Sequence, residues 1–175
     1  MKGRKIPETI TEEEFISILK ATKKPKKRLA YMLGFYQAMR ISEITNLQLE
    51  NVDYSMKLIR IIQAKGKKDR NIPIIKPLLL RPEQVKLAMK HLPINTTTRA
   101  LQISFKNAAN KILKKDLHFH CLRHSGASWL LNKKKWDIRQ VQSFLGHSKL
   151  QTTEIYTHVS PEDLIALEWG DDAMK

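Results

Sequence analysis

Residues 58–74, LIRIIQAKGKKDRNIPI, decide the fold class of this chain. Two runs rich in β-branched residues, 58–62 and 70–74, flank a tip at 64–69 that is almost wholly basic. Such runs on either side of a glycine-containing turn predict a β-hairpin. Elsewhere the apolar residues recur at helical spacing. The sequence therefore predicts a mainly α protein with a small antiparallel β-sheet, an α+β fold.

Helices are expected on both sides of this hairpin. Thr11 and Glu14 form a capping box that starts the first helix. Apolar residues at helical spacing between 29 and 36 indicate a second helix, after a basic run at 23–28. A short third helix is expected at 42–49, closed by a turn at 51–53. Beyond the hairpin, helices are expected at 82–91, 98–113, 121–131, 137–145, 150–156 and 161–169.

Length and composition exclude several classes of protein. A chain of 175 residues with 42% hydrophobic residues is long enough to bury a core. Its one cysteine excludes an intrachain disulfide framework and an all-cysteine zinc site. No apolar run approaches the roughly 20 residues of a membrane span, and the first 15 residues lack the apolar core of a signal peptide. We therefore expect a soluble, intracellular, cytoplasmic protein with no membrane partner.

The charge of the chain points to a polyanionic partner. Lys and Arg number 32 against 17 Asp and Glu, which gives a formal charge of +15. The basic residues are clustered at 23–28, 65–70 and 133–135, whereas the last residues are acidic. Nucleic acid is the leading interpretation, because phosphate contacts release counterions. Solubility alone is the alternative interpretation of the same charge.

Arg40 and Glu43 form the first group of candidate site residues. They lie three residues apart at the entry to a helix, and so on one helical face. Such a pair is usually a surface ion pair that contributes little to stability. The apolar residues around Arg40 indicate instead that its side chain points into an enclosed place.

A second group lies in His118-Phe119-His120-Cys121-Leu122-Arg123-His124. A metal site is one interpretation, because His120 and His124 are at i, i+4 and Cys121 and His118 are nearby. Arg123 would repel a cation there. The other interpretation is an anion site, in which arginine supplies a fork of donors and histidine a titratable one.

The third group follows Gly146, which is expected to end a helix. His147 lies in the next turn, and Tyr156 follows between polar residues. Of the four tyrosines, Tyr156 is the best placed for chemistry. A phenol with a pKa near 10 needs cations or a base beside it to act as a nucleophile.

Taken together, these residues resemble the catalytic domain of the tyrosine recombinases, the family of phage-type integrases and Xer-like resolvases. The resemblance rests on five stretches in family order, from Thr11 to Val159: Arg40-Ile41-Ser42-Glu43, Lys65 at the hairpin tip, His120-Cys121-Leu122-Arg123-His124, Leu145-Gly146-His147-Ser148 and Thr152-Thr153-Glu154-Ile155-Tyr156-Thr157-His158-Val159. Ala38 stands where the family commonly has glycine, and Phe119 where proline often precedes the histidine. Neither change removes a catalytic group.

The resemblance implies a role for each candidate residue. Tyr156 is the expected nucleophile, which attacks a DNA phosphate and leaves a 3′-phosphotyrosyl bond. Arg40, Arg123 and His147 match the residues that hold the phosphate oxygens. The remaining roles are those of Lys65 as general acid, with Lys67 and Lys68 as alternatives, His120 as acceptor of the tyrosine proton, and Glu43 as supporting residue.

The expected activity is site-specific cutting and rejoining of double-stranded DNA, as a homo-oligomer on the DNA, without a metal, ATP or other cofactor and without a small-molecule substrate. The alternatives are a nicking-closing enzyme similar to a topoisomerase, and a basic DNA-binding protein without catalysis.

The resemblance also divides the chain. Residues 1–10 are expected to be a lead-in or the remnant of a linker, and residues 11–159 the catalytic domain. Residues 160–175 are expected to be a tail helix that docks either on its own core or on a neighbouring protomer. Family members usually carry an N-terminal DNA-clamping domain, so the chain is interpreted as a catalytic fragment or a short stand-alone member.

Overall fold

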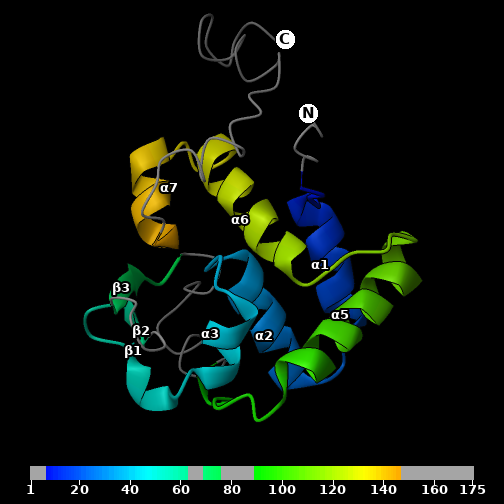
Figure 1. Ribbon diagram of the computed structural model, residues 1–175, viewed down its shortest axis with the longest axis horizontal. Helices are drawn as coiled ribbons and strands as arrows, with labels where there is room; N and C mark the ends of the chain where they lie inside the picture. Colours follow the sequence, from blue (N-terminus) through cyan, green and yellow to red (C-terminus); the bar gives the residue numbers. More distant parts are fainter. Residues whose placement is uncertain (1–6, 63–68, 76–88, 147–175) are drawn as a thin grey trace, which may run out of the picture. The chain divides into compact units, whose positions relative to one another are not determined.

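The computed structural model describes residues 7–62, 69–75 and 89–146, which are mainly helical with one small sheet (Figure 1). In chain order the elements are α1 (Glu12–Ala21), α2 (Pro25–Phe35), α3 (Ile41–Asn46), the 3₁₀ helix η1 (Leu49–Asn51), β1 (Val52–Asp53), β2 (Leu58–Ile61), β3 (Arg70–Pro73), α5 (Thr98–Leu113), α6 (His120–Asn132) and α7 (Ile138–Leu145). The predicted fold class is confirmed. The chain divides into two compact units, Met1–Gly126 and Ala127–Lys175, and the division falls inside α6.

Local capping signals set several helix ends where the sequence predicts them. Thr11 accepts a 3.2 Å hydrogen bond from the Glu14 backbone N–H, and the Glu14 carboxylate accepts one of 3.0 Å from the Thr11 N–H. Thr97 and Asp137 cap α5 and α7 by accepting backbone N–H hydrogen bonds through their side-chain oxygens. Gly146 ends α7 with φ at 66°, a conformation that glycine adopts without the steric cost of a Cβ.

The sheet is a three-stranded antiparallel meander in the order β1-β2-β3. Ile59 pairs with Ile72 across β2 and β3, and both side chains are buried. Ile61 pairs with Arg70, so Arg70 lies on the same, inward face of the hairpin. The predicted hairpin is confirmed for its strands, while residues 64–68 of its tip lie outside the described residues.

The segment between α2 and the hairpin differs from the prediction in two ways. The helix expected at 42–49 ends at Asn46, because Leu47 adopts an extended conformation and buries its side chain. The chain then turns again through η1, where the Asn51 side chain accepts a 2.9 Å hydrogen bond from the Gln48 N–H. The predicted turn at 51–53 is wrong for Val52 and Asp53, since both pair with β2 as a third strand.

An aromatic cluster forms the core of the first unit. Phe15 on α1 stacks on Phe35 of α2, with ring centroids 4.3 Å apart. Tyr31 and Phe119 each make an edge-to-face contact with Phe105 on α5, with centroids 5.4 and 5.6 Å apart. Helices α1 and α5 also pack together. These contacts join α1, α2, α5 and the residue just before α6.

In the second unit, α7 buries one apolar face. Val141, Phe144 and Leu145 are buried on it. Phe144 meets the ring of Trp136 edge to face at 5.4 Å. The Trp136 backbone N–H also donates a 3.0 Å hydrogen bond to the carbonyl of Leu130 in the last part of α6. The connection between α6 and α7 is thus packed within its own unit.

Other expected helices lie wholly or mostly outside the described residues: 150–156 and 161–169 wholly, and 82–91 except for its last three residues. Of the helices that the structure describes, none has the length and the apolar character needed to cross a membrane.

Candidate active site

Arg40 lies at the N-terminus of α3, directly after a buried segment. The three residues before it, Gln37, Ala38 and Met39, are buried. Arg40 itself is the N-cap residue of α3, and its side chain is 30% exposed. The predicted enclosure of this arginine is confirmed in part, since its side chain is neither buried nor free in solvent.

Glu43 is the anchor of this region. Its side chain is 7% exposed and accepts two hydrogen bonds from Arg40, from Nη1 at 2.9 Å and from the backbone N–H at 2.8 Å. Arg70 on β3 donates two more, from Nη1 at 2.9 Å and Nη2 at 3.1 Å. The pair is therefore not a lone surface ion pair, because the carboxylate sits between two arginines. Burial raises the pKa of Glu43, but the hydrogen bonds and the positive charges outweigh burial and hold the pKa below its usual value.

Arg123 enters the same region from α6. Its side chain is 2% exposed, and Nη1 donates a 2.7 Å hydrogen bond to the carbonyl oxygen of Ala38. Ala38 has φ at 46°, a left-handed conformation that glycine adopts more readily than alanine does. The charge of Arg123 also lowers the pKa of Glu43. Arg40 and Arg123 therefore both lie close enough to Glu43 to interact with its carboxylate.

His120 is the first residue of α6, and its ring lies edge to face with that of His124, with centroids 4.5 Å apart. His120 is exposed to solvent. Partial desolvation by the surrounding groups, and then the charges of Arg123 and Arg40, lower its pKa from 6.5. The imidazole is therefore neutral at pH 7 and able to accept a proton.

The segment before His120 is held by α5. Gln102 accepts a 3.0 Å hydrogen bond from the Phe119 N–H, and its Nε2 lies 3.3 Å from Nδ1 of His118. The Phe119 ring is buried in the aromatic cluster beside Phe105 and Tyr31. Phenylalanine in place of the proline common in the resembled family thus has a packing role here.

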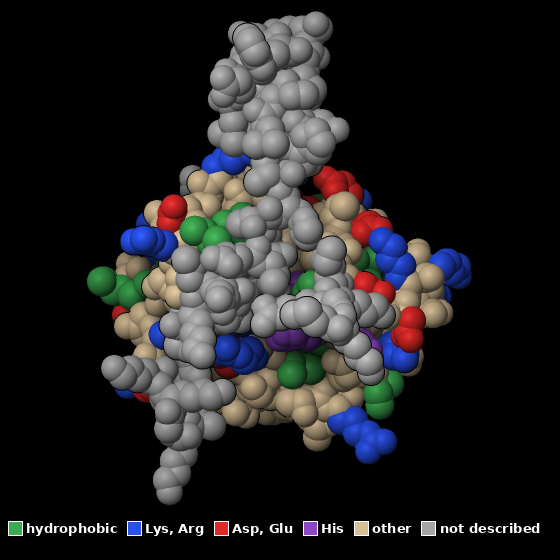
Figure 2. Space-filling view, turned by 45° about the horizontal axis from the view of Figure 1, so that its top comes forward, with side chains coloured by type: hydrophobic (Ala, Val, Ile, Leu, Met, Phe, Trp, Pro, Cys, Tyr) green, Lys and Arg blue, Asp and Glu red, His purple; other side chains and the backbone are tan. Residues whose placement is uncertain are grey.

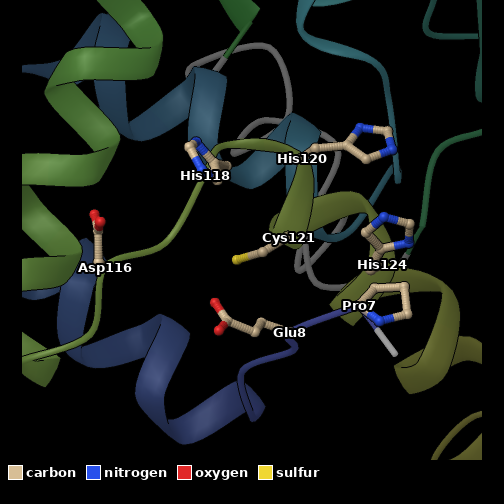
Figure 3. Close-up of a pocket in the computed structure, with 7 residues that line it drawn as sticks. All are labelled: Pro7, Glu8, Asp116, His118, His120, Cys121 and His124. Atoms are coloured by element: carbon tan, nitrogen blue, oxygen red, sulfur yellow. The ribbon is translucent and has the colours of Figure 1, made fainter. Parts of the chain in front are cut away.

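A pocket of about 550 Å³ opens beside His120 and is lined by Pro7, Glu8, Asp116, His118, His120, Cys121 and His124 (Figure 3). Figure 3 shows the Cys121 sulfur and the Glu8 carboxylate directed into the same space. In the space-filling view, histidine side chains gather on one face of the molecule (Figure 2). Burial, and then the negative charge of Glu8, raise the pKa of the Cys121 thiol to about 12. This thiol is therefore protonated at neutral pH, unlike a metal-binding or nucleophilic cysteine.

Within residues 7–62, 69–75 and 89–146, no three His, Cys, Asp or Glu side chains are arranged so that they could hold a metal ion. The four residues of the metal interpretation, His118, His120, Cys121 and His124, all belong to this part of the chain. Their arrangement does not support that alternative.

The structure thus brings together four of the seven candidate residues: Arg40, Glu43, His120 and Arg123. The other three, Lys65, His147 and Tyr156, lie outside the described residues. Arg70 was missed by the sequence reasoning. The signal that could have found it is alternation along its strand, because Arg70, Ile72 and Ile74 fall on one face and both isoleucines are buried.

Comparison with known proteins places this chain in a family. Residues 8–163 match the model of the phage integrase family. The tyrosine recombinase of Thermosipho africanus is 35% identical over 174 residues, which cover 91% of this chain and 60% of that protein. Tyrosine recombinase XerA of Pyrococcus furiosus is 32% identical, again over 91% of this chain and 60% of the relative. The chain thus spans about 60% of the length of these curated relatives.

Solved structures share the fold. The crystal structure of XerA recombinase superposes with a TM-score of 0.76 at 24% identity, covering 93% of this chain and 64% of that one. A lambda integrase (75–356) dimer bound to a COC′ core site gives a TM-score of 0.69 at 19% identity, covering 86% of this chain and 61% of that one. Because the family model matches most of its length and its curated relatives exceed 30% identity, the chain belongs to the phage integrase family, the tyrosine recombinases.

Proposed function

We propose that this chain is the catalytic domain of a site-specific DNA recombinase that cuts and rejoins double-stranded DNA through a 3′-phosphotyrosyl intermediate. The observation that carries the proposal is the hydrogen bond from Arg123 to the Ala38 carbonyl, 85 residues apart in sequence. It places a buried guanidinium against the segment that presents Arg40. Two arginines joined in this way suit a phosphate, because a guanidinium carries several N–H donors in one plane and a full positive charge.

The proposed reaction is an in-line transfer at phosphorus. The Tyr156 oxygen attacks the scissile phosphorus, the bond from phosphorus to the 5′-oxygen breaks, and the phosphate remains on the enzyme as a 3′-phosphotyrosyl ester. Negative charge develops on the non-bridging oxygens, and Arg40, Arg123 and His147 stabilise it. The ester keeps the energy of the broken bond, so rejoining by a 5′-hydroxyl needs no ATP. The arginines, with His147, take the charge-stabilising role that metal ions have in other nucleases.

Two proton transfers complete the proposal. His120 takes the phenolic proton as Tyr156 attacks, and its lowered pKa supports this role because the imidazole is neutral at pH 7. Lys65 gives a proton to the leaving 5′-oxygen. Rejoining reverses both transfers, so each group is restored at the end of a strand exchange.

The proposal includes the partner and the division of the chain. Residues 11–159 form the catalytic domain, and residues 160–175 form a tail that docks in cis or on a neighbouring protomer. The substrate is double-stranded DNA, on which the protein acts as a homo-oligomer in the cytoplasm. The XerH relative crystallised on its difH substrate supports DNA as the partner, and so does the charge of +15.

A nicked suicide substrate tests the reaction class and the nucleophile together. Because the short 5′-hydroxyl product diffuses away, the wild-type chain is expected to remain covalently attached to DNA on a denaturing gel. Tyr156→Phe is the matched control, since it removes one oxygen and should abolish the adduct while DNA binding persists. An adduct in that variant would place the nucleophile elsewhere. No adduct with the wild-type chain bound to its site would favour the DNA-binding protein without catalysis.

Supercoiled DNA without a recombination site separates recombination from nicking and closing. A recombinase should leave such a plasmid supercoiled, because cleavage depends on assembly at its site. Rapid relaxation of this plasmid would support the alternative activity, that of an enzyme similar to a topoisomerase.

A further inference from the structure

Arg70 is a charged residue that contacts Glu43 and to which the proposed function gives no role. It is the first residue of β3, and the pairing of β3 with β2 turns its side chain toward the inward face. The side chain is 11% exposed, and both of its terminal nitrogens donate hydrogen bonds to the Glu43 carboxylate, at 2.9 and 3.1 Å. A bidentate fork of this kind fixes the orientation of the carboxylate as well as its charge.

The same carboxylate holds Arg40. Glu43 accepts from the Arg40 backbone N–H at 2.8 Å and from Nη1 at 2.9 Å. Arg40 thus gives Glu43 one guanidinium nitrogen, whereas Arg70 gives two. The position of Arg40 depends on where the Glu43 carboxylate points, and Arg70 sets that direction.

The charges of Arg40, Glu43 and Arg70 also indicate that Arg70 acts on Arg40 through Glu43. Two arginines and one carboxylate leave this cluster with a net charge of +1. Without Arg70, Glu43 and Arg40 would form a neutral ion pair, and the buried carboxylate would have to take more of its hydrogen bonds from Arg40. Arg70 therefore neutralises Glu43, so that the positive charge of Arg40 remains available to an anion.

The other end of strand β3 is also hydrogen-bonded to the segment that precedes Arg40. The Gln37 amide is buried and, in the orientation that satisfies both of its groups, donates to the Pro73 carbonyl at 3.0 Å and accepts from the Ile75 N–H at 2.7 Å. Arg70 and Gln37 thus join both ends of the strand to residues 37–43. The described part of β3 is thereby bonded to the segment that contains Arg40.

We propose that Arg70 is a positioning residue for phosphoryl transfer, which acts through Glu43 to place Arg40 and to keep its charge available for the scissile phosphate. The inference rests on the proposed function. Arg70 itself does not touch the substrate in this proposal.

The test compares Arg70→Gln with Arg60→Gln. Arg60 lies on the neighbouring strand β2, its side chain is 65% exposed, and its ion pair with Asp69 is long at 3.5 Å. Both variants lose one charge from the same hairpin. With DNA pre-bound and enzyme in excess, Arg70→Gln should slow covalent cleavage by about 100-fold, because misplacement by about an ångström has that effect on rate. Arg60→Gln should stay within about twofold.

Two further measurements separate positioning from a loss of fold. In a Glu43→Gln background, Arg70→Gln should cause little further loss, because the carboxylate through which it acts is gone. On a methylphosphonate link, which lacks one anionic oxygen, Arg70→Gln should share the diastereomer preference of Arg40→Gln. Arg70→Lys keeps the charge without the fork and should cleave at an intermediate rate if Arg70→Gln is too unstable to assay.

The outcomes are distinguishable. Failure of the wild-type chain to form an adduct would refute the proposed function and leave the Arg70 network unexplained. A wild-type adduct together with normal cleavage by Arg70→Gln would overturn the positioning role alone. Equal losses for Arg70→Gln in the wild-type and Glu43→Gln backgrounds would also overturn it, since Arg70 would then act independently of Glu43.

Discussion

Arg123 donates a 2.7 Å hydrogen bond from Nη1 to the carbonyl oxygen of Ala38, and this bond joins α6 to the turn that precedes Arg40. The guanidinium is buried, and its positive charge lowers the pKa of both Glu43 and His120. The approach of α6 to this turn depends on Gly126, one helical turn beyond Arg123. A Cβ at Gly126 would lie 1.9 Å from the Phe35 carbonyl oxygen.

Gly126→Ala should destabilise the protein by about 3 kcal/mol, even though alanine is the better helix former. The reason is that the clash is with backbone, so α6 or the end of α2 must move. Urea unfolding followed by circular dichroism measures the change in the free energy of unfolding.

Gly34→Ala is the matched control for that substitution. A Cβ at Gly34 would meet side-chain atoms of Leu122 and Phe119 at 3.1–3.2 Å. These side chains can give by a few tenths of an ångström, so a change within about 1 kcal/mol is expected. If the two alanine variants were equally stable, the close approach of α6 at Gly126 would be wrong.

His120 should titrate below pH 6.5, because partial desolvation and the charges of Arg123 and Arg40 disfavour its protonated form. As pH falls below about 6.5, His120 binds a proton in the unfolded chain but not yet in the folded chain. The free energy of unfolding therefore decreases with falling pH until the native pKa is passed. Well above pH 6.5 both states are neutral, and there His120 contributes no pH dependence.

NMR titration of the imidazole protons measures this pKa, with His120→Gln identifying the resonance. Arg40→Met removes one nearby positive charge and should move the pKa of His120 upward. A native pKa at or above 6.5, or no change in Arg40→Met, would contradict the proposed electrostatic coupling.

Cys121 should resist alkylation in the native protein although its sulfur faces a pocket (Figure 3). Its pKa of about 12 leaves almost no thiolate at pH 8. Because the chain has one cysteine, iodoacetamide labelling followed by intact mass reports on this site alone. We expect labelling to be at least about 100-fold slower than in the urea-unfolded chain. Equal rates would show that the thiol is neither buried nor protonated as described.

Lys114→Gly should stabilise the protein by about 0.5 kcal/mol. Lys114 ends α5 with φ at 57°, where a side chain is strained and glycine is not. Lys111→Gly is the control, since the same exchange three residues earlier, within the helix, should cost about 0.5–1 kcal/mol. Urea unfolding of both variants tests the opposite signs, and a loss of stability in Lys114→Gly would refute the left-handed cap.

Local chemistry made part of this molecule predictable from sequence. The caps at Thr11, Asp137 and Gly146 involve residues within three or four positions of one another, so their signals survive without tertiary context. The alternation of apolar residues in the hairpin strands is equally local. Arg40, Glu43, His120 and Arg123 are candidate site residues because the order of motifs along the chain resembles that of the family.

Tertiary structure decided what depends on contacts between distant segments. Val52 and Asp53 form a strand because β2 offers them partners, and α3 stops at Asn46 because burial of Leu47 competes with continued helix. Arg70 is decisive only because the β2–β3 register turns it inward to Glu43, 27 residues away. Alternation along β3 marks Arg70 as inward-facing, but its pairing with Glu43 leaves no signal in sequence, since the energy of that ion pair arises from geometry that exists only once the sheet and α3 have met.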